Sequence, residues 1–285
     1  MIVGFLARHA VSIFMQLHPF RNLLCRATVV LLLNASPLVA VEIIAHRGAS
    51  YDAPENTLSA LTLGWEQGAD ADELDVHLTK DGQIVVIHDA DTKRTTGVNK
   101  VVSDSTLEEL RGLDAGSWKG TKWKGETIQT LAEALETLPE GKRVFIEIKC
   151  GPEILPALER VLRASGKKPE QLVLIGFNHA TMEKAMKRFP ECPIYWLAGY
   201  KADKRTGRRP EIETLIKKAR SAGFNGLDLD FEFPITPKFV SKVNSAGLRL
   251  YVWTVDDPAV AARLAAAGVD GITTNRPGWL RERLK

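Results

Sequence analysis

Charged and histidine side chains end several short apolar runs in this chain of 285 residues. Each run has the length and composition of a β-strand, so these side chains are expected at strand ends. The side chains in question are His46, Arg47, Glu73, Asp75, His88, Glu147 and Lys149. Three carboxylates, two imidazoles, a guanidinium and an ammonium that meet at one point are suited to metal-assisted attack on a phosphate ester.

The three acids of this set predict a metal site. Glu73 and Asp75 are two residues apart in a strand, so both side chains face the same side. Glu147, on another strand, supplies a third oxygen, and an all-oxygen set favours Mg²⁺ or Ca²⁺ over Zn²⁺. The alternative is a buried ionic network with Arg47 and Lys149, but three acids exceed two cations before any substrate binds.

The remaining members suit proton transfer and anion binding. Imidazole titrates near neutral pH, so His46 and His88 are expected to act as an acid–base pair. Arg47 can grip two phosphate oxygens and Lys149 supplies a point charge, so both are expected to hold the anion. His77 shares the face of Asp75 but lies nearer the turn, and it is expected at the surface.

Weaker candidates occur at other element ends. Glu55, where the first helix begins, either binds substrate hydroxyls or serves the electrostatics of the helix end. Trp253 either packs against a small polyol or fills the mouth of a barrel. Asp228 and Asp230 share one face of a later strand, and each is as compatible with a structural role as with a functional one.

Strands and helices alternate from residue 42 onward. The expected strands cover 42–46, 71–76, 143–149, 172–177, 194–198, 226–230, 248–255 and 271–274. The expected helices cover 57–67, 129–138, 152–164, 180–188, 212–222, 237–245, 258–267 and 277–284. This pattern predicts a (β/α)8 TIM-type barrel, a fold of about 250 residues. A doubly wound open sheet is the alternative, but it gathers its chemistry at one switch point, whereas here the chemistry recurs along the chain.

A hairpin and an insertion follow the second strand. Asp81-Gly82 is a turn signal, and residues 83–88 are expected to return antiparallel. A two-residue loop would place Asp75 opposite His88, with Cβ atoms about 4.5–5.5 Å apart. Residues 89–127, which include Trp118 and Trp123, are expected to form a small inserted cap over the site.

The first forty residues have the character of a leader. They contain Arg8, Arg21 and Arg26, no acid, and an apolar stretch that ends in small residues near Ala40. This is a secretory signal pattern, which predicts a periplasmic or secreted protein with no stable membrane span after cleavage. An N-terminal membrane anchor is the alternative, and Met15 is a second candidate start.

The charge balance of the rest excludes one class of partner. The whole chain carries 38 Lys and Arg against 35 Asp and Glu, so the part after the three leader cations is balanced. A balanced domain does not indicate a nucleic-acid surface. No nucleic-acid partner is therefore expected.

The ordered motifs resemble the glycerophosphodiester phosphodiesterase family from about residue 43 to the C-terminus. They are His46-Arg47-Gly48, Pro54-Glu55-Asn56-Thr57, Glu73-x-Asp75-Val76, Thr79-x-Asp81-Gly82, His88-Asp89, Glu147-x-Lys149, Asp228-x-Asp230, Trp253-x-Val255 and Gly271-Ile272-x-Thr274-Asn275-x-Pro277. The resemblance implies a (β/α)8 barrel that hydrolyses glycerophosphodiesters to glycerol 3-phosphate and an alcohol. It also implies the metal, acid–base and phosphate roles given above, and an inserted subdomain at 89–127.

The sequence departs from the family pattern at two places, and two alternative functions remain open. The helix after the insertion begins Ile128-Gln129-Thr130-Leu131 without the usual Pro, and Asn275 stands where Asp is common. A relative that acts on lysophospholipids, in the manner of lysophospholipase D, would need an apolar groove, which Trp118 and Trp123 could line. A non-catalytic binding barrel would have lost part of the charged set, and every member is present. The head-group alcohol, the choice of metal and the oligomeric state stay open.

Overall fold

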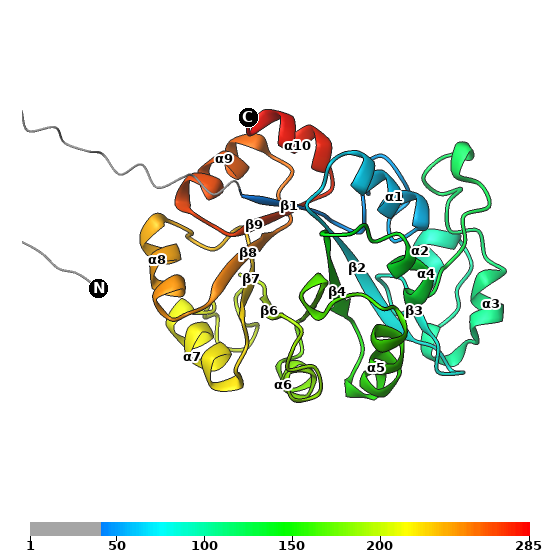
Figure 1. Cartoon of the computed structure of the whole chain (residues 1–285), viewed down its shortest axis with the longest axis horizontal. Helices are drawn as coiled ribbons and strands as arrows, with labels where there is room; N and C mark the ends of the chain where they lie inside the picture. Colours follow the sequence, from blue (N-terminus) through cyan, green and yellow to red (C-terminus); the bar gives the residue numbers. More distant parts are fainter. Residues whose placement is uncertain (1–40) are drawn as a thin grey trace, which may run out of the picture. The chain divides into compact units, whose positions relative to one another are not determined.

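A closed barrel forms the part of the chain that the computed structural model describes, residues 41–285. The leader predicted over 1–40 lies outside the described residues. Within the described range, eight parallel strands pair in a ring, because β1 pairs with both β9 and β2 (Figure 1). The ring excludes the open-sheet alternative and confirms the (β/α)8 prediction. The barrel strands are β1 (Glu42–Ala45), β2 (Ala71–Leu78), β4 (Arg143–Ile148), β5 (Leu172–Gly176), β6 (Ile194–Ala198), β7 (Gly226–Asp230), β8 (Arg249–Trp253) and β9 (Gly271–Thr274).

Helices lie on the outside of the ring, where seven of them connect successive barrel strands and the last, α10, follows β9 (Figure 1). They are α1 (Leu58–Glu66), α4 (Leu131–Glu136), α5 (Leu155–Ala164), α6 (His179–Arg188), α7 (Ile212–Ala222), α8 (Pro237–Ser245), α9 (Pro258–Ala267) and α10 (Pro277–Arg283). Among the described residues, no helix is both long enough and apolar enough to cross a membrane.

Local capping chemistry sets where these helices begin and end. The side chains of Thr57, Asn178 and Asp257 accept hydrogen bonds from the first-turn amides of α1, α6 and α9. Gly223 and Gly268 end α7 and α9 with φ of 77° and 90°, in the left-handed region that suits glycine. These capping residues explain why the ends of several helices match the sequence prediction.

The core has two layers that follow the alternation of side chains along the strands. One face of each strand packs against the surrounding helices in a large apolar cluster. The other face fills the barrel interior, where Phe145, Tyr195 and Tyr251 pack together beneath Trp253. The ring of Phe145 lies edge-on to Tyr251 with centroids 5.2 Å apart. A packed interior of this kind leaves chemistry to the barrel ends.

Removal of the Phe145 ring is expected to destabilise the barrel strongly. Its side chain is buried and its ring contacts the rings of Tyr195 and Tyr251, so its removal leaves a cavity between them. We expect Phe145→Ala to lower the free energy of unfolding by about 3–5 kcal/mol. Urea denaturation measures the change, with exposed Phe177→Ala as the control. A loss as small as that of the control would contradict this account of the interior.

The β2–β3 hairpin corrects the predicted register by one residue. Val76 pairs with Val86 of β3 (Ile84–Val86), and Ile87 N donates to Asp75 O at 3.0 Å, so Asp75 faces Ile87 and not His88. The cause is a three-residue loop. Thr79 N donates to Gln83 O at 2.9 Å, and the loop closes through Gly82 at φ 76°.

The prediction that His77 lies at the surface is also wrong. His77 is 8% exposed, and its Nε2 lies 3.1 Å from the carbonyl oxygen of His88. The chain that returns from the hairpin contacts the ring through the carbonyl group of His88, which helps to bury it. Burial lowers the pKa of His77, and it stands beside the site as a structural residue.

The segment 89–127 has its own small core against the hairpin. It contains α2 (Lys93–Thr96), η1 (Val102–Asp104), α3 (Leu107–Arg111) and η2 (Thr121–Trp123), and it lies beside β2 and β3 (Figure 1). Val85 and Ile87 of the hairpin pack against Val102, Leu110 and Ile128. The insertion is therefore anchored on the barrel next to His88.

Candidate active site

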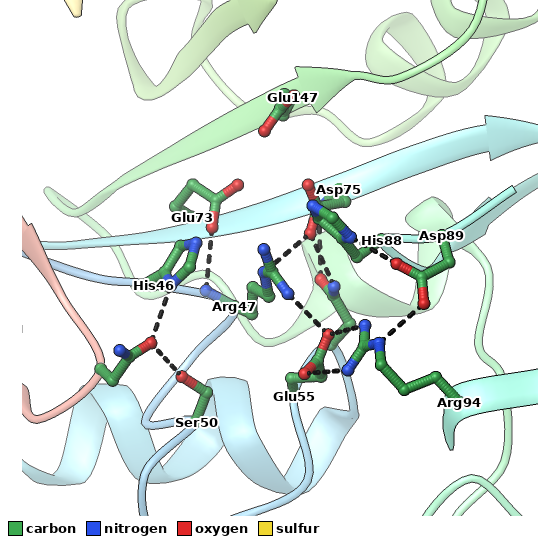
Figure 2. Close-up of polar contacts among 12 residues, drawn as sticks. His46, Arg47, Ser50, Glu55, Glu73, Asp75, His88, Asp89, Arg94 and Glu147 are labelled. Carbon is green, nitrogen blue, oxygen red and sulfur yellow. Dashed lines mark hydrogen bonds and ion pairs between the residues drawn. The ribbon is translucent and has the colours of Figure 1, made fainter. Parts of the chain in front are cut away.

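A cavity of about 180 Å³ opens at the carboxyl ends of the barrel strands. This is the end at which (β/α)8 barrels carry their active sites. Its lining includes the predicted site residues His46, Arg47, Glu73, His88, Glu147, Lys149 and Trp253. Asp75 and Glu55 stand behind this lining and contact Arg47 (Figure 2). The structure thus brings the predicted residues together in one place.

The three carboxylates lie close together and are buried. One oxygen of each of Glu73, Asp75 and Glu147 lies within 4.8 Å of the others. The parallel register pairs Asp75 with Glu147 across β2 and β4, and Glu73 is two residues away on the same face. Like charges in an apolar strand end are costly unless cations balance them.

The electrostatics of the cluster show that cost. Burial, followed by the charges of Asp75 and Glu147, raises the pKa of Glu73 well above its ordinary value. Burial and the Asp75 charge raise the pKa of Glu147 to about 7. Burial also opposes ionisation of Asp75, but Arg47 and Lys149 outweigh it and hold the pKa of Asp75 low. The site is short of positive charge.

A tight turn after β1 places Arg47 against this cluster. Arg47 has φ 57°, and its backbone N–H donates to Glu73 Oε2 at 2.9 Å. Gly48 follows at φ 75°, where a Cβ atom would lie 2.4 Å from the backbone carbon of Ala60. Only glycine fits that position, which explains the His-Arg-Gly sequence.

Asn56 orients Asp75, the most buried carboxylate of the three in the cluster. Its side-chain Nδ2 donates to Asp75 Oδ2 at 2.8 Å, and its Oδ1 accepts from the Asp75 backbone N–H at 3.1 Å. Asn56 itself has φ 60°, a conformation that asparagine tolerates better than most residues. Asp75 therefore has one oriented oxygen, and its Oδ1 is buried with no hydrogen-bond partner.

Two cations reach the cluster from different strands. Arg47 Nε lies 3.3 Å from Asp75 Oδ2, and Lys149 Nζ lies 2.8 Å from Glu147 Oε1 and 3.5 Å from Asp75 Oδ1. Burial alone would lower the pKa of Lys149, but the neighbouring acids raise it, so the ammonium stays charged. Both side chains line the cavity where an anion would enter.

His46 is held by a side-chain relay from the last strand. Its Nδ1 lies 2.7 Å from Asn275 Oδ1, and Asn275 Nδ2 donates to Asp256 Oδ2 at 2.6 Å. Because Asp256 fixes the orientation of the amide, the Asn275 oxygen faces His46 and Nδ1 carries the hydrogen. Nε2 is left with a lone pair. Burial, together with the charge of Arg47, lowers the pKa of His46 to about 4.

His88 has an acidic partner instead. Its Nδ1 lies 2.6 Å from Asp89 Oδ1, and Arg94 Nε donates to Asp89 Oδ2 at 2.7 Å (Figure 2). Burial works against ionisation of Asp89, but Arg94 and His88 lower its pKa to about 2. The Nδ1 atom of His88 therefore faces a carboxylate, whereas the Nδ1 atom of His46 faces a neutral amide, so the two histidines have different partners.

The structure separates the weaker candidates. Asp228 lines the cavity, and its Oδ1 is buried without a partner, whereas Asp230 leaves the cavity and accepts from the Glu232 N–H at 2.9 Å. Trp253 Nε1 donates to Asp228 O at 3.1 Å, and Phe177 packs edge-on to Trp253 with centroids 5.5 Å apart. Together they form an aromatic wall that the sequence predicted only in part.

Two tryptophans of the insertion stay outside the cavity. Neither Trp118 nor Trp123 is among its lining residues, and Trp118 Nε1 donates to Ala115 O within its own segment. The predicted contribution of these two tryptophans to the cavity lining is therefore not seen.

Fold and site together define a class of protein, a barrel enzyme with an acidic, histidine-containing centre at its strand ends. Residues 46–279 match the family model described as the glycerophosphoryl diester phosphodiesterase family, and the chain belongs to that family. The enzyme class predicted from the sequence, a phosphoric diester hydrolase, is confirmed.

Named relatives and a solved structure agree with this assignment. A glycerophosphodiester phosphodiesterase of Caldanaerobacter subterraneus subsp. tengcongensis is 39% identical over 244 residues, which cover 84% of this chain and 95% of the relative. One from Bacillus subtilis is 32% identical, with 82% and 83% covered. The structure of an Oleispira antarctica phosphodiesterase in complex with the product sn-glycerol-3-phosphate superposes with a TM-score of 0.78 at 30% identity, and covers 86% of this chain and 97% of its own.

Proposed function

We propose that this protein hydrolyses glycerophosphodiesters to sn-glycerol 3-phosphate and an alcohol in the cavity at the strand ends. The observation that carries the proposal is the meeting of three carboxylates, two histidines, an arginine and a lysine around one cavity. The product complex of the Oleispira antarctica relative supports the same reaction. The charge set suits a small anionic substrate rather than a polymer.

Glu73, Asp75 and Glu147 are the proposed metal ligands. Their geometry fits a divalent cation, because the three oxygens lie within 4.8 Å of one another and Asp75 Oδ1 has no hydrogen-bond partner. Carboxylate ligands alone favour Mg²⁺ or Ca²⁺. When bound, such an ion would offset the charge of the carboxylates and polarise the phosphate ester.

Arg47 and Lys149 are the proposed phosphate holders. They enter the cavity just after the ends of β1 and β4, both are charged, and each also lies beside Asp75. A phosphate diester carries one negative charge that spreads over its oxygens as the reaction proceeds. Fixed cations in a buried site stabilise that charge without reorganisation. Trp253 is proposed to pack against the glycerol carbons, and Glu55 acts on Arg47.

His46 and His88 divide the proton transfers between them. His46 is uncharged at neutral pH with its Nε2 lone pair free, which suits the acceptance of a proton from the nucleophile. His88, oriented by Asp89, is the proposed donor of a proton to the leaving alkoxide. The nucleophile is either water or the glycerol 2-hydroxyl of the substrate, which would form a cyclic phosphate first. A substrate analogue without the 2-hydroxyl distinguishes the two routes.

The direct test is the release of glycerol 3-phosphate from glycerophosphocholine, followed with an enzyme-coupled assay. We expect turnover in Mg²⁺ or Ca²⁺ and loss of turnover in EDTA. Turnover that persists in EDTA would overturn the metal proposal. A protein that releases no glycerol 3-phosphate from any head-group diester with either ion would overturn the proposed function.

We further propose that the protein is exported, because the predicted leader ends at Ala40 and the family match begins at residue 46. Expression with the leader intact should therefore yield a mature protein that begins near Val41 in the periplasmic or secreted fraction. Intact-mass measurement of that fraction checks the cleavage position. A full-length protein that stays with the membrane fraction would instead support the anchor alternative.

A further inference from the structure

An arginine of the inserted segment touches the site from outside. Arg94 lies in α2, and all three nitrogens of its guanidinium bind acids (Figure 2). Nε donates to Asp89 Oδ2 at 2.7 Å, and the two terminal nitrogens donate to the two oxygens of Glu55 at 2.8 Å each. The planar fork of arginine suits such a double contact, which lysine cannot reproduce.

Each of these acids also binds a residue of the cavity lining. Asp89 Oδ1 lies 2.6 Å from His88 Nδ1, and Glu55 Oε1 accepts from Arg47 at 2.8 Å. The result is one continuous chain of side-chain contacts that runs from His88 through Asp89, Arg94 and Glu55 to Arg47 (Figure 2). Arg94 is its middle member, and it is the member contributed by the insertion.

We infer that Arg94 is a positioning residue of the active site, which orients His88 through Asp89 and Arg47 through Glu55. The inference rests on the proposed function. Without Arg94, Glu55 faces a single cation and would hold Arg47 with both oxygens, away from the phosphate. Asp89 would lose the donor that fixes its second oxygen, and the imidazole of His88 would lose its fixed orientation.

A nearby arginine shows how Arg94 differs from an ordinary surface ion pair. The Arg111 side chain, also in the insertion, is 44% exposed and pairs with Glu133, while the Arg94 side chain is 43% exposed. Pairs at such exposure add little to stability. If Arg94 were only a surface pair, its removal would resemble the removal of Arg111. A positioning role predicts a loss of activity with little loss of stability.

The test compares Arg94→Ala, Arg94→Lys and the matched control Arg111→Ala. We expect Arg94→Ala to lower kcat/KM for glycerophosphocholine by about 10–100-fold, as is usual for partners that orient active groups. Arg94→Lys should recover part of the loss, and Arg111→Ala should stay within about twofold of the wild type. Melting temperatures of the two alanine variants should match. Equal activity of both alanine variants would overturn the inference.

The two arms of the chain can be separated by kinetics. Glu55→Gln should mainly raise KM, Asp89→Asn should mainly lower kcat, and Arg94→Ala should do both. In the Glu55→Gln, Asp89→Asn double background, Arg94→Ala should have little further effect, because its partners are already neutral. A full additional loss in that background would show that Arg94 acts by another route and would overturn the inference.

Measurement of product binding distinguishes a failure of the inference from a failure of the proposed function. Calorimetry with sn-glycerol 3-phosphate and Ca²⁺ should show about tenfold weaker binding in Arg94→Ala and unchanged binding in Arg111→Ala. Binding that depends on Arg94 in a protein without turnover would support the inference while the proposed reaction fails. Normal wild-type turnover with unchanged product binding and kinetics in Arg94→Ala would overturn the inference alone. A wild type that neither turns over nor binds product would overturn both.

Discussion

Alanine at His46 is expected to lower kcat for glycerophosphocholine by about 10²–10⁴-fold, the range that a positioned acid or base supplies. The reason is geometric. The relay through Asn275 fixes the ring and leaves Nε2 as the one proton acceptor that His46 presents to the cavity. His88→Ala should cause a loss of similar size, because the leaving alkoxide then lacks its proton donor. Steady-state kinetics with saturating substrate measures both.

His179→Ala is the matched control for these variants. His179 begins α6 and packs edge-on to Trp196, away from the cavity lining. The His179→Ala substitution also removes an imidazole, but one outside the proposed site. The kcat of this variant should therefore stay near that of the wild type. A kcat within about threefold of the wild type in His46→Ala would remove His46 from the reaction.

Glu73→Gln is expected to remove both metal-dependent turnover and metal-dependent stabilisation. Glu73 is buried between two other carboxylates and a bound cation would relieve that repulsion. For the wild type, a ligand at about 100 times its Kd adds about 2.7 kcal/mol to the free energy of unfolding. Thermal denaturation with and without Ca²⁺ or Mg²⁺ should show this gain in stability for the wild type. The Glu73→Gln variant should show no such gain.

The pH dependence of the stabilisation by metal follows from the same carboxylates. Metal binding needs them ionised, and burial together with the charge of Asp75 raises the pKa of Glu147 to about 7. The stabilisation by metal should therefore shrink as the pH falls through about 7. Asp230→Asn, which alters a strand-end acid outside the cavity lining, should keep the wild-type response. A metal-induced rise of equal size in Glu73→Gln would contradict the ligand assignment.

The sequence predicted the elements that local chemistry defines. The bounds of β6, β7 and β9 match the expected strands, because apolar runs end there in glycine or polar residues. The convergence of the charged residues was predictable as well, since parallel strands in a barrel end on one face. What the pattern could not provide was the register of the hairpin. A loop of three residues and one of two have the same turn signal, and the hydrogen bond of Thr79 to Gln83 decides between them.

Contacts between distant segments were the other part that sequence could not provide. Asn275 reaches His46 across 229 positions, and Arg94 reaches Glu55 across 39 from a segment without periodicity. Neither residue type signals its partner. The burial of His77 was missed for the same reason, because it depends on the return arm of the hairpin. Residues whose role comes from a long-range partner become visible only when the chain is folded.

The most direct test of the central claim is a crystal structure with Ca²⁺ and sn-glycerol 3-phosphate. We expect Ca²⁺ on Glu73, Asp75 and Glu147, and the phosphate between Arg47 and Lys149. A larger cavity of about 700 Å³ lies at the opposite end of the strands, where Arg143 and Arg249 are part of its lining. Product bound in that cavity, with the carboxylate cluster free of metal, would contradict the account.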